Sequence, residues 1–554
     1  MPETPHPEIV PLGGVGEFGL NMTVYRHGGD CLVVDAGMMF PTGNFPGVDY
    51  VVPDLTFLAD AGPIRGVVLT HAHEDHVGAL PHLLAHFDAP VWGTDYTLEL
   101  VRRRLIQRGY DRPVDLRRLP DSPAAVEIGP FSVEAVTVAH SIPQCRLLAI
   151  RTPAGLVVHS GDFKLDTDPP DGNGTDLRRL TELGDEGVLA LLADSTNAER
   201  EGQTPSEGSV EPGLDEVLRD ATGRVVLTTF ASNIQRLSIL ARLARRHGRR
   251  LGLLGAAINQ HADIAQQLGL LTFPEGTRVA AEELAGIPRS TQLAVAGGSQ
   301  GEGLSAMSRI AAGRHRDVRL EPGDTVIHSA RIIPGNEKPI GKMINRLLRL
   351  GARVITADDA PVHVSGHAAA QELRGLIQAL RPCWYVPVHG EYSQLKANVR
   401  LATRAGLEPG NILLVENGDR IAITGDWLRL TGKAPVGRTY LEAPGDEVTG
   451  DHIRERRKSG RDGVVVAVVE IDPQTGAPRG YPDVVARGFT PDLDDGGALL
   501  EQSRTAIAQA LDEAPAAERM DTEALAGRVE THLRRCIRKN VNRQPLVIAR
   551  VRFS

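Results

Sequence analysis

The sequence predicts an α/β protein in which an αββα sandwich is interrupted by a second α/β segment and followed by a small α+β domain. Three observations support this fold class. Apolar stretches of strand length alternate with helix-like stretches from residue 67 to residue 388, which is typical of α/β domains. Polar residues follow directly after several of the expected strands. Segments rich in proline, glycine and charge, at 199–212 and 430–456, divide the chain.

The first part of the chain predicts a sandwich of two sheets between helices. Residues 8–37 indicate a strand hairpin with a glycine-rich turn at 13–19, and no helix clearly follows this turn, so it does not predict a nucleotide site. The next expected elements are, in order, a strand at 67–69, a helix at about 78–87, a strand at 91–93, a helix at 95–109, and strands at 126–139, 147–152, 156–160 and 188–192.

The interrupting segment begins after residue 197 and predicts a parallel sheet. Its expected elements are strands at 224–230, 251–254, 292–296 and 324–329, and a helix from 231 to about 247. Small polar residues after these strands favour a ligand crevice along one edge of the sheet. The remaining expected elements are a helix at 368–380, strands at 384–388, 463–471 and 545–551, and helices at 497–511 and 522–540.

The composition limits the classes of protein that the chain can belong to. It is 41% hydrophobic and 24% charged, which argues against disorder. The net charge of −9 argues against a protein that coats nucleic acid, although basic clusters occur at 102–104, 245–250 and 534–539. Four scattered cysteines predict free thiols. Met1–His6 has no signal core and no apolar run could cross a bilayer, so we expect a cytoplasmic protein without membrane contact.

The segment 67–78 carries the most informative motif. An apolar strand ends there in His71, His73, Asp75 and His76. Imidazole suits zinc and its neighbours, and carboxylate suits harder divalent ions. A solvated polar loop is the alternative, but three histidines and an aspartate in this spacing, directly after a strand, favour a site for two metal ions.

Similar residues follow later strands, namely His140, Asp162 and His389, and Asp35 follows an early one. With these partners in order, His-x-His-x-Asp-His resembles the metallo-β-lactamase superfamily. The interrupting segment, then His-x-Ser-Gly-His at 363–367 and Pro-Val-His-Gly-Glu-Tyr at 387–392, resembles the β-CASP group of nucleases and, within it, the bacterial ribonuclease J family.

This resemblance implies roles for the residues of the site. One ion would be held by His71, His73 and His140 and the other by Asp75, His76 and His389, with Asp162 as the bridge and Asp35 in support. Zn²⁺ is the expected metal, and Mn²⁺ or Mg²⁺ are alternatives. Asp75 would also orient the attacking hydroxide. His367 would protonate the leaving oxygen and Asp194 would position it, unless Asp194 is only a turn cap.

RNA binding is assigned to two segments. Ser232, Asn233 and Ile234 lie where a helix begins after a strand, which is a natural phosphate site, although Ser232 could simply cap the helix. His363, Val364, Ser365, Gly366 and His367 form the second segment. The segment 254–258 departs from the more polar sequence expected there. Asp49 is considered for an accessory divalent site, against the simpler account of a surface carboxylate.

Domain boundaries and function follow from the same resemblance. We expect a discontinuous metallo-β-lactamase domain (1–205 and 356–430), a β-CASP domain (206–355), a linker (431–460) and a C-terminal domain (461–554). The expected activity is a dinuclear 5′→3′ exoribonuclease with endonuclease capacity. Its expected partners are single-stranded 5′-monophosphorylated RNA, other copies of the same chain in a homodimer or homotetramer, and other RNA-decay proteins.

Two alternative functions are considered. One is a hydrolase of a small ester, thioester or lactone, which would lack the interrupting segment. The other is a non-catalytic RNA-processing scaffold, which would not need all seven metal ligands.

Overall fold

The computed structural model describes residues 6–41, 43, 45–443, 445–489 and 497–554. Of the N-terminal residues Met1–His6, only His6 lies among the described residues. The chain forms two compact units, one of Met1–Phe40 with Val51–Thr439 and one of Pro41–Tyr50 with Tyr440–Ser554. In the described part of the chain, no helix combines the length and the apolar character that crossing a membrane requires.

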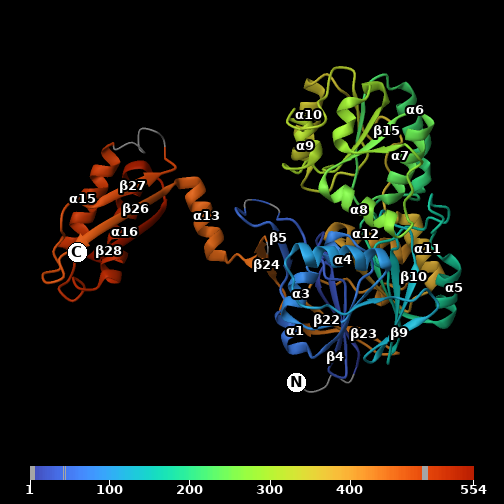
Figure 1. The fold of residues 1–554 in the computed structure, drawn as a ribbon. Helices are drawn as coiled ribbons and strands as arrows, with labels where there is room; N and C mark the ends of the chain where they lie inside the picture. Colours follow the sequence, from blue (N-terminus) through green and yellow to red (C-terminus); the bar gives the residue numbers. More distant parts are fainter. Residues whose placement is uncertain (1–5, 42, 44, 444, 490–496) are drawn as a thin grey trace. The chain divides into compact units, whose positions relative to one another are not determined.

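The first unit contains two sheets that face each other (Figure 1). The eight-stranded sheet has the order β23-β22-β1-β3-β4-β6-β7-β8 and the six-stranded sheet the order β20-β13-β12-β11-β10-β9. The strands of the first are β1 (Glu8–Gly13), β3 (Met22–His27), β4 (Asp30–Val34), β6 (Ile64–Val68), β7 (Val91–Gly93), β8 (Leu116–Arg118), β22 (Asp419–Ile423) and β23 (Leu428–Lys433). Those of the second are β9 (Ala125–Ile128), β10 (Phe131–Thr137), β11 (Arg146–Thr152), β12 (Gly155–His159), β13 (Val188–Asp194) and β20 (Trp384–Val388).

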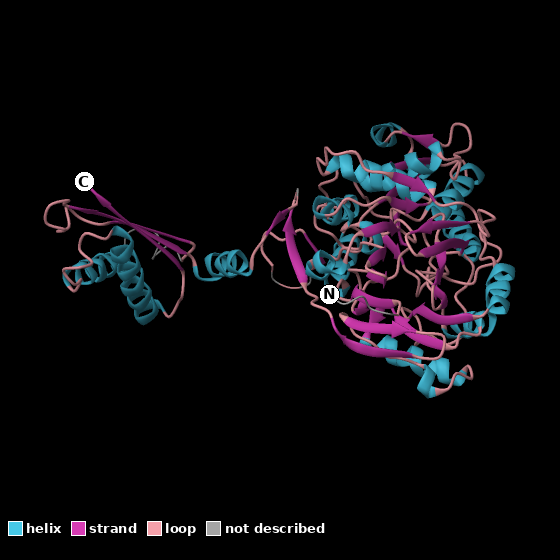
Figure 2. Cartoon of the chain, turned by 90° about the horizontal axis from the view of Figure 1, so that it is seen from below, coloured by secondary structure: helices cyan, strands magenta, loops and turns pink. Residues whose placement is uncertain are grey.

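Apolar residues on the inner faces of both sheets form one core, with Leu32 and Val68 on one side and Val133 and Val157 on the other. Helices cover the outer faces (Figures 1 and 2). They are α1 (Thr56–Ala61), α3 (Leu80–His86) and α4 (Asp95–Gln107) on the first sheet, and α5 (Leu177–Glu186), α11 (Ala370–Leu380) and α12 (Tyr392–Arg404) on the second. The predicted αββα sandwich is confirmed.

The interrupting segment forms a parallel sheet of the order β16-β15-β17-β14-β18-β19. Its strands are β14 (Val225–Thr228), β15 (Arg250–Leu254), β16 (Arg278–Val279), β17 (Gln292–Ala296), β18 (Thr325–His328) and β19 (Arg353–Ile355). Helices α6 (Glu211–Asp220), α7 (Ile234–Arg246) and α8 (Ala256–Gln267) pack on one face, and α9 (Ala306–Ala311) and α10 (Glu337–Arg349) on the other (Figure 1).

The second unit contains a small sheet of the order β27-β26-β28 that is covered on one face by two helices. Its elements are α13 (Gly450–Asp462), β26 (Val464–Ile471), β27 (Asp483–Arg487), α15 (Ala498–Asp512), α16 (Thr522–Val541) and β28 (Leu546–Phe553). Strand β26 alternates buried and half-buried residues along its length, because side chains of a strand point to opposite faces in turn.

Several elements differ from the predictions. The strand predicted at 126–139 is a hairpin of β9 and β10, because Gly129 turns the chain with a φ of 58°. The segment 199–212 is partly helical from Glu207, whose side chain is buried. The segment 430–456 contains the end of β23, strands β24 (Arg438–Glu442) and β25 (Asp446–Glu447), and the first part of α13. Strands β22, β27 and the end strands β8, β16 and β19 were not predicted.

Candidate metal centre

The metal-ligand motif directly follows strand β6 of the eight-stranded sheet. Strand β6 ends at Val68, the chain bends at Thr70, and the short helix α2 (Glu74–Val77) follows His73. Asp75 and His76 belong to this helix, a short element that the sequence did not predict. Residues that end β10, β12 and β20 complete the cluster, as the order of motifs predicted.

The first group of ligand atoms consists of three imidazole nitrogens and one carboxylate oxygen. Nδ1 of His73 lies 3.1 Å from Nε2 of His71 and 3.2 Å from Nε2 of His140. Oδ2 of Asp162 lies 3.6 Å from both of those Nε2 atoms. A tetrahedral ion with bonds of about 2.0–2.1 Å has ligands about 3.3 Å apart, so these four atoms have the spacing that such an ion requires.

The second group lies on the other side of Asp162. Oδ1 of Asp162 is 3.3 Å from Nε2 of His76 and 3.5 Å from Nε2 of His389. Oδ2 of Asp75 lies 3.6 Å and 3.4 Å from the same two nitrogens. The second group therefore has nearly the same dimensions as the first.

Asp162 belongs to both groups, with one oxygen directed at each. The side chain is buried, and Oδ1 has no hydrogen-bond partner among the residues that the structure describes. A buried carboxylate oxygen without a donor is costly, and a cation shared between the groups would remove that cost. The donor set and its spacing thus fit two divalent ions with Asp162 between them.

Asp35, which was predicted to support the site, contacts a member of the second group. Its Oδ2 accepts a hydrogen bond from Nδ1 of His76 at 2.7 Å, and its Oδ1 accepts one from the backbone amide of Thr70 at 2.8 Å. Both Asp35 and His389 have left-handed backbone conformations, with φ of 62° and 52°. Strained positions of this kind persist where the surrounding structure holds them, and they are common at functional sites.

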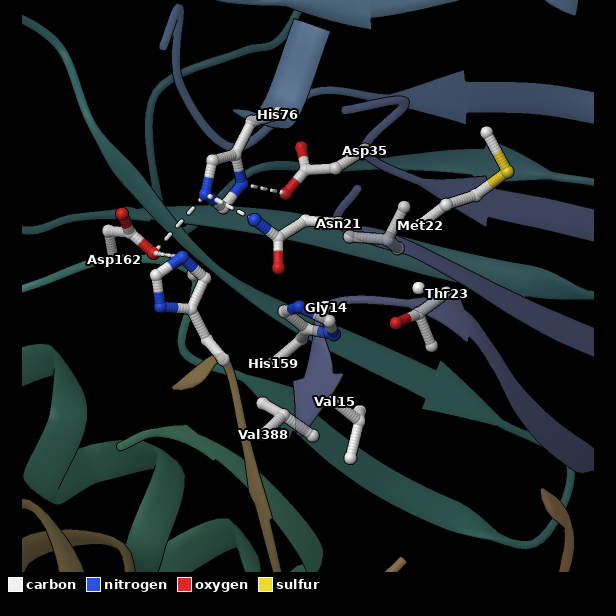
Figure 3. A pocket seen from close by; sticks show the side chains of 14 residues that line it. Gly14, Val15, Asn21, Met22, Thr23, Asp35, His76, His159, Asp162 and Val388 are labelled. Atoms are coloured by element: carbon white, nitrogen blue, oxygen red, sulfur yellow. Dashed lines mark hydrogen bonds and ion pairs between the residues drawn. The ribbon is translucent and has the colours of Figure 1, made fainter. Parts of the chain in front are cut away.

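A small hollow of about 20 Å³ adjoins the second group (Figure 3). Asn21 lies at its edge, with Nδ2 donating to the backbone carbonyl of Asp75 at 2.9 Å and lying 3.2 Å from Nε2 of His76. His159, on the far side of the hollow, lies 3.1 Å from the hydroxyl of Tyr25. Asn21 thus borders the cluster, whereas His159 pairs with Tyr25.

The loop 363–367 reaches the first group through a backbone contact. The carbonyl of Gly366 accepts a hydrogen bond from Nδ1 of His140 at 2.7 Å, which leaves Nε2 of His140 free to face the cluster. A Cβ atom at Gly366 would lie 2.7 Å from that Nδ1, so only glycine allows this approach. The loop and the ligand therefore hold each other in place.

His367 and Asp194 form a pair beside the cluster. Nδ1 of His367 lies 2.8 Å from Oδ2 of Asp194 and 3.9 Å from Oδ2 of Asp162. Oδ1 of Asp194 accepts hydrogen bonds from the backbone amide and hydroxyl of Thr196, and lies 3.3 Å from Nδ1 of His389. Asp194 therefore both stabilises a turn and contacts His367, so the two roles that the sequence left open are compatible.

The electrostatics of the cluster suit metal binding. Burial lowers the pKa of His71, His73 and His140, to about 4 for His73, so their lone pairs are available at neutral pH. Burial acts in the same direction on His76 and His389, but Asp162 and the other nearby carboxylates raise the pKa of both well above the ordinary value. These two imidazoles would release protons when an ion binds.

Of the residues assigned to RNA near α7, Ser232 has the most direct relation to the cluster. Its hydroxyl lies 3.1 Å from Nε2 of His73. The helix is capped instead by Asn233, whose side chain accepts from the backbone amide of Arg236 at 2.9 Å. The side chain of Ile234 lies in the core, and its backbone amide donates to the carbonyl of Ser232. Ser232 is thus the member of this trio that faces the cluster.

The other RNA segment carries polar groups without partners. Both ring nitrogens of His363 are buried and lack hydrogen-bond partners among the described residues. Burial and the nearby Arg236 lower the pKa of His363 well below its ordinary value. The hydroxyl of Ser365 accepts from the amide of Asn197 at 2.9 Å, and Arg331 also contacts Asn197. Sequence reasoning missed Asn197, Arg236 and Arg331, which no motif marked.

Asp49, which was considered for an accessory divalent site, has surroundings that differ from those of the clusters above. It is exposed, and its Oδ2 accepts a hydrogen bond from the backbone amide of Ala443 at 2.8 Å. It belongs to none of the metal-binding groups found among the described residues. The geometry favours the account of a surface carboxylate.

Comparison with known proteins agrees with this architecture. Residues 15–194 match the metallo-beta-lactamase superfamily, 222–347 the beta-CASP domain of ribonuclease J, 357–412 the Zn-dependent metallo-hydrolase RNA specificity domain, and 451–552 the ribonuclease J C-terminal domain. A solved protein of unknown function from Enterococcus faecalis, 15% identical, covers 76% of this chain and all of its own with a TM-score of 0.53, which shows a shared fold.

Sequence relatives extend along nearly the whole chain. Ribonuclease J of Synechocystis is 38% identical and the match covers 98% of this chain and 86% of the relative. Ribonuclease J of Mycolicibacterium smegmatis is 37% identical, covering 98% and 96%, and that of Sinorhizobium meliloti is 39% identical, covering 96% and 94%.

The sandwich and its shared carboxylate place the chain among the metallo-β-lactamase-fold hydrolases that carry a β-CASP insertion. Within that class, the chain belongs to the ribonuclease J family. It is a metal-dependent nuclease that binds RNA.

Proposed function

We propose that the protein is a 5′→3′ exoribonuclease with endonuclease capacity that acts in RNA maturation and mRNA decay. The observation that carries this proposal is the pair of ligand groups that share Asp162, with the His367–Asp194 pair beside them. The predicted domain boundaries belong to the same proposal.

We propose Zn²⁺ as the native metal, with Mn²⁺ or Mg²⁺ as alternatives for activity. The support is the donor set, which consists of five imidazoles and two carboxylates from His71, His73, Asp75, His76, His140, Asp162 and His389, because imidazole-rich sites suit zinc. When bound, two divalent ions would lower the pKa of a water molecule and neutralise phosphate charge.

The residues of the chain would divide the remaining work. Asp75 is half-buried at the edge of the second group, where its carboxylate can orient the attacking water as well as serve as a ligand. Asp194 holds Nδ1 of His367, so Nε2 is the ring atom that is left to give a proton to the leaving oxygen. The side chain of His367 is 19% exposed, which allows contact with a substrate.

Recognition of the 5′ end is proposed for the insert, because two ions and a water cannot distinguish one internal phosphodiester from another. The loops 231–233, 298–302 and 333–336 follow β14, β17 and β18 at one edge of the sheet. Gln300 joins two of them, since its side chain donates to the carbonyl of Arg331 at 2.8 Å and accepts from the amide of Ile333 at 2.9 Å. A pocket built from these loops would accept a 5′-monophosphate and exclude the bulkier triphosphate.

A homodimer or homotetramer is proposed from the open face of the C-terminal sheet. Val466 pairs with Val485 on one side and Ile548 on the other, so the three side chains form one row on that face. Val485 is 41% exposed and Ile548 is 37% exposed. Contact with other RNA-decay proteins is a further proposal, and the four free cysteines support a reducing compartment such as the cytoplasm.

The decisive experiment compares end-labelled RNAs that carry a 5′-monophosphate, a 5′-triphosphate or a 5′-hydroxyl. The metal-loaded protein is expected to release mononucleotides from the 5′ end of the monophosphorylated RNA and to act more slowly on the triphosphate. Hydrolysis of small esters or thioesters without any cleavage of RNA would contradict the proposal, as would release of nucleotides from the 3′ end.

A further inference from the structure

A second hollow lies on the insert, between α9 and α10, and shares no lining residue with the cluster of metal-ligand residues. It has a volume of about 220 Å³ and is lined by Gly301, Gly303, Ser308, Ala311, Pro339, Lys342, Met343 and Arg346. The two helices lie side by side on one face of the insert (Figure 1). The side chains of Ala311 and Met343 in its lining are buried, whereas Lys342 and Arg346 are exposed and form what we call its rim.

The rim belongs to a basic stripe along α10. Lys338, Lys342, Arg346 and Arg349 recur at intervals of three or four residues, which places them on one side of a helix. All four are exposed, whereas the opposite side of α10 packs into the core. In the described part of the chain, none of the four forms an ion pair or a side-chain hydrogen bond.

The basic clusters that the sequence marked differ from this stripe in their surroundings. Arg102 and Arg103 pair with Glu99, and Arg246 pairs with Asp215. Such pairing offsets part of the charge of these two clusters, as expected for a solvated helix face. The stripe on α10 keeps its positive charge although the chain has a net charge of −9, so it is a local site of attraction for an anion.

The hollow adjoins the loops that we assign to the 5′ end of the RNA. Gly301 and Gly303 belong to the loop after β17, and Pro339 follows the loop after β18 by a few residues. A Cβ atom at Gly301 would lie 2.8 Å from the backbone of Pro339, so the loop is packed directly on the start of α10. An RNA held at those loops can therefore continue onto the stripe.

We propose that the hollow between α9 and α10 is an auxiliary site for single-stranded RNA, separate from the metal centre. The apolar part of its lining accepts one base, and Lys342 and Arg346 bind the adjoining phosphates, with Ser308 as a hydrogen-bond partner. Lys338 and Arg349 extend the contact along the backbone. A positively charged track along the backbone is a feature of proteins that bind single strands without regard to sequence. This inference rests on the proposed action on RNA and adds a second place where RNA is held.

The test compares the double variant Lys342→Ala/Arg346→Ala with the matched control Arg314→Ala/Arg353→Ala. The two control residues are exposed, lie on the same insert and do not line the hollow. Their replacement removes the same charge as the double variant. Binding of fluorescein-labelled oligouridylates is followed by anisotropy in the presence of chelator, so that no cleavage occurs. Two probes, of about four and about thirty nucleotides, are used so that binding at the hollow can be distinguished from binding at the other RNA contacts of the protein.

For the long probe, the double variant is expected to bind about three- to tenfold more weakly, and the slope of log affinity against log salt is expected to fall by about 1.4, because each phosphate contact on a single strand contributes about 0.7. For the short probe, the double variant is expected to have the same affinity as the wild type. The control variant is expected to have the wild-type affinity for both probes. Equal losses for both variants, or an unchanged slope, would overturn the inference. If the wild type binds the long probe but does not cleave RNA when metals are restored, the proposed function fails while the binding comparison still decides the auxiliary site.

Discussion

Replacing His367 by alanine removes an imidazole that contacts Asp194. His367 lies outside the two groups described above, although it forms a third set of closely spaced ligand atoms with Asp162, Asp194 and His389. The distance of 2.8 Å between Nδ1 of His367 and Oδ2 of Asp194 assigns Nδ1 to the carboxylate, so Nε2 is the atom that faces the leaving oxygen. A positioned acid contributes about 10²–10⁴-fold, which at about 1.4 kcal/mol per tenfold corresponds to roughly 3–5 kcal/mol of the barrier. We therefore expect His367→Ala to lower the single-turnover rate at saturating RNA by that factor.

The assay measures single-turnover cleavage of 5′-monophosphorylated RNA together with the dissociation constant and the metal content of each variant. Asp194→Asn is expected to cost less, about 10- to 100-fold, because it acts by holding the imidazole. The double variant should lose little more than His367→Ala alone if Asp194 acts through that imidazole. Unchanged cleavage at saturation, with all of the loss in RNA affinity, would show that His367 anchors phosphate and is not an acid.

The remaining predictions concern the ions, the 5′ end and assembly. Metal-reconstituted protein is expected to contain about two divalent ions per chain, and elemental analysis near zero with activity retained in strong chelator would refute this. Asp162→Ala should abolish cleavage while circular dichroism stays close to the wild type, because its carboxylate serves both groups, and near-normal turnover would remove Asp162 from the site. Ser299→Ala and Asn336→Ala should reduce the preference for RNA with a 5′-monophosphate over RNA with a 5′-triphosphate. Equal digestion of these two RNAs by the wild type and by both variants would contradict the role of the loops. Val466→Glu should shift the mass in light scattering toward the monomer, and an unchanged mass would place the interface elsewhere.

Much of the site could be predicted because its residues follow strands. His140, Asp162 and His389 each come after an apolar stretch, and parallel or adjacent strand ends meet at one edge of a sandwich. The helix α2 was missed because four residues are too few to show a period of 3.6. Ser232 was predicted to bind RNA, with a helix cap as the alternative; Asn233 occupies the cap position, and the hydroxyl of Ser232 lies 3.1 Å from Nε2 of His73.

The insert was harder to predict in detail because its functional groups are held by tertiary contacts. Arg236 is fully buried and contacts Glu207 and Ser329 from distant parts of the chain, and a single arginine inside a helix gives no sign of this in the sequence. The stripe on α10 was overlooked for a related reason. Its basic residues are three or four apart and so do not form a continuous run. In the continuous runs at 102–104 and 245–250, Arg103 and Arg246 are paired with acidic neighbours.

The second ligand group joins Asp75 to His389, which is 314 residues further along the chain. On a ribosome, the N-terminal ligands would emerge long before the last one, with the whole insert made in between. A nascent chain that has reached only residue 388 has no ligand at the final position of the second group. The order of the ligands therefore keeps the cleavage centre incomplete until the chain has grown past residue 389 of its 554 residues.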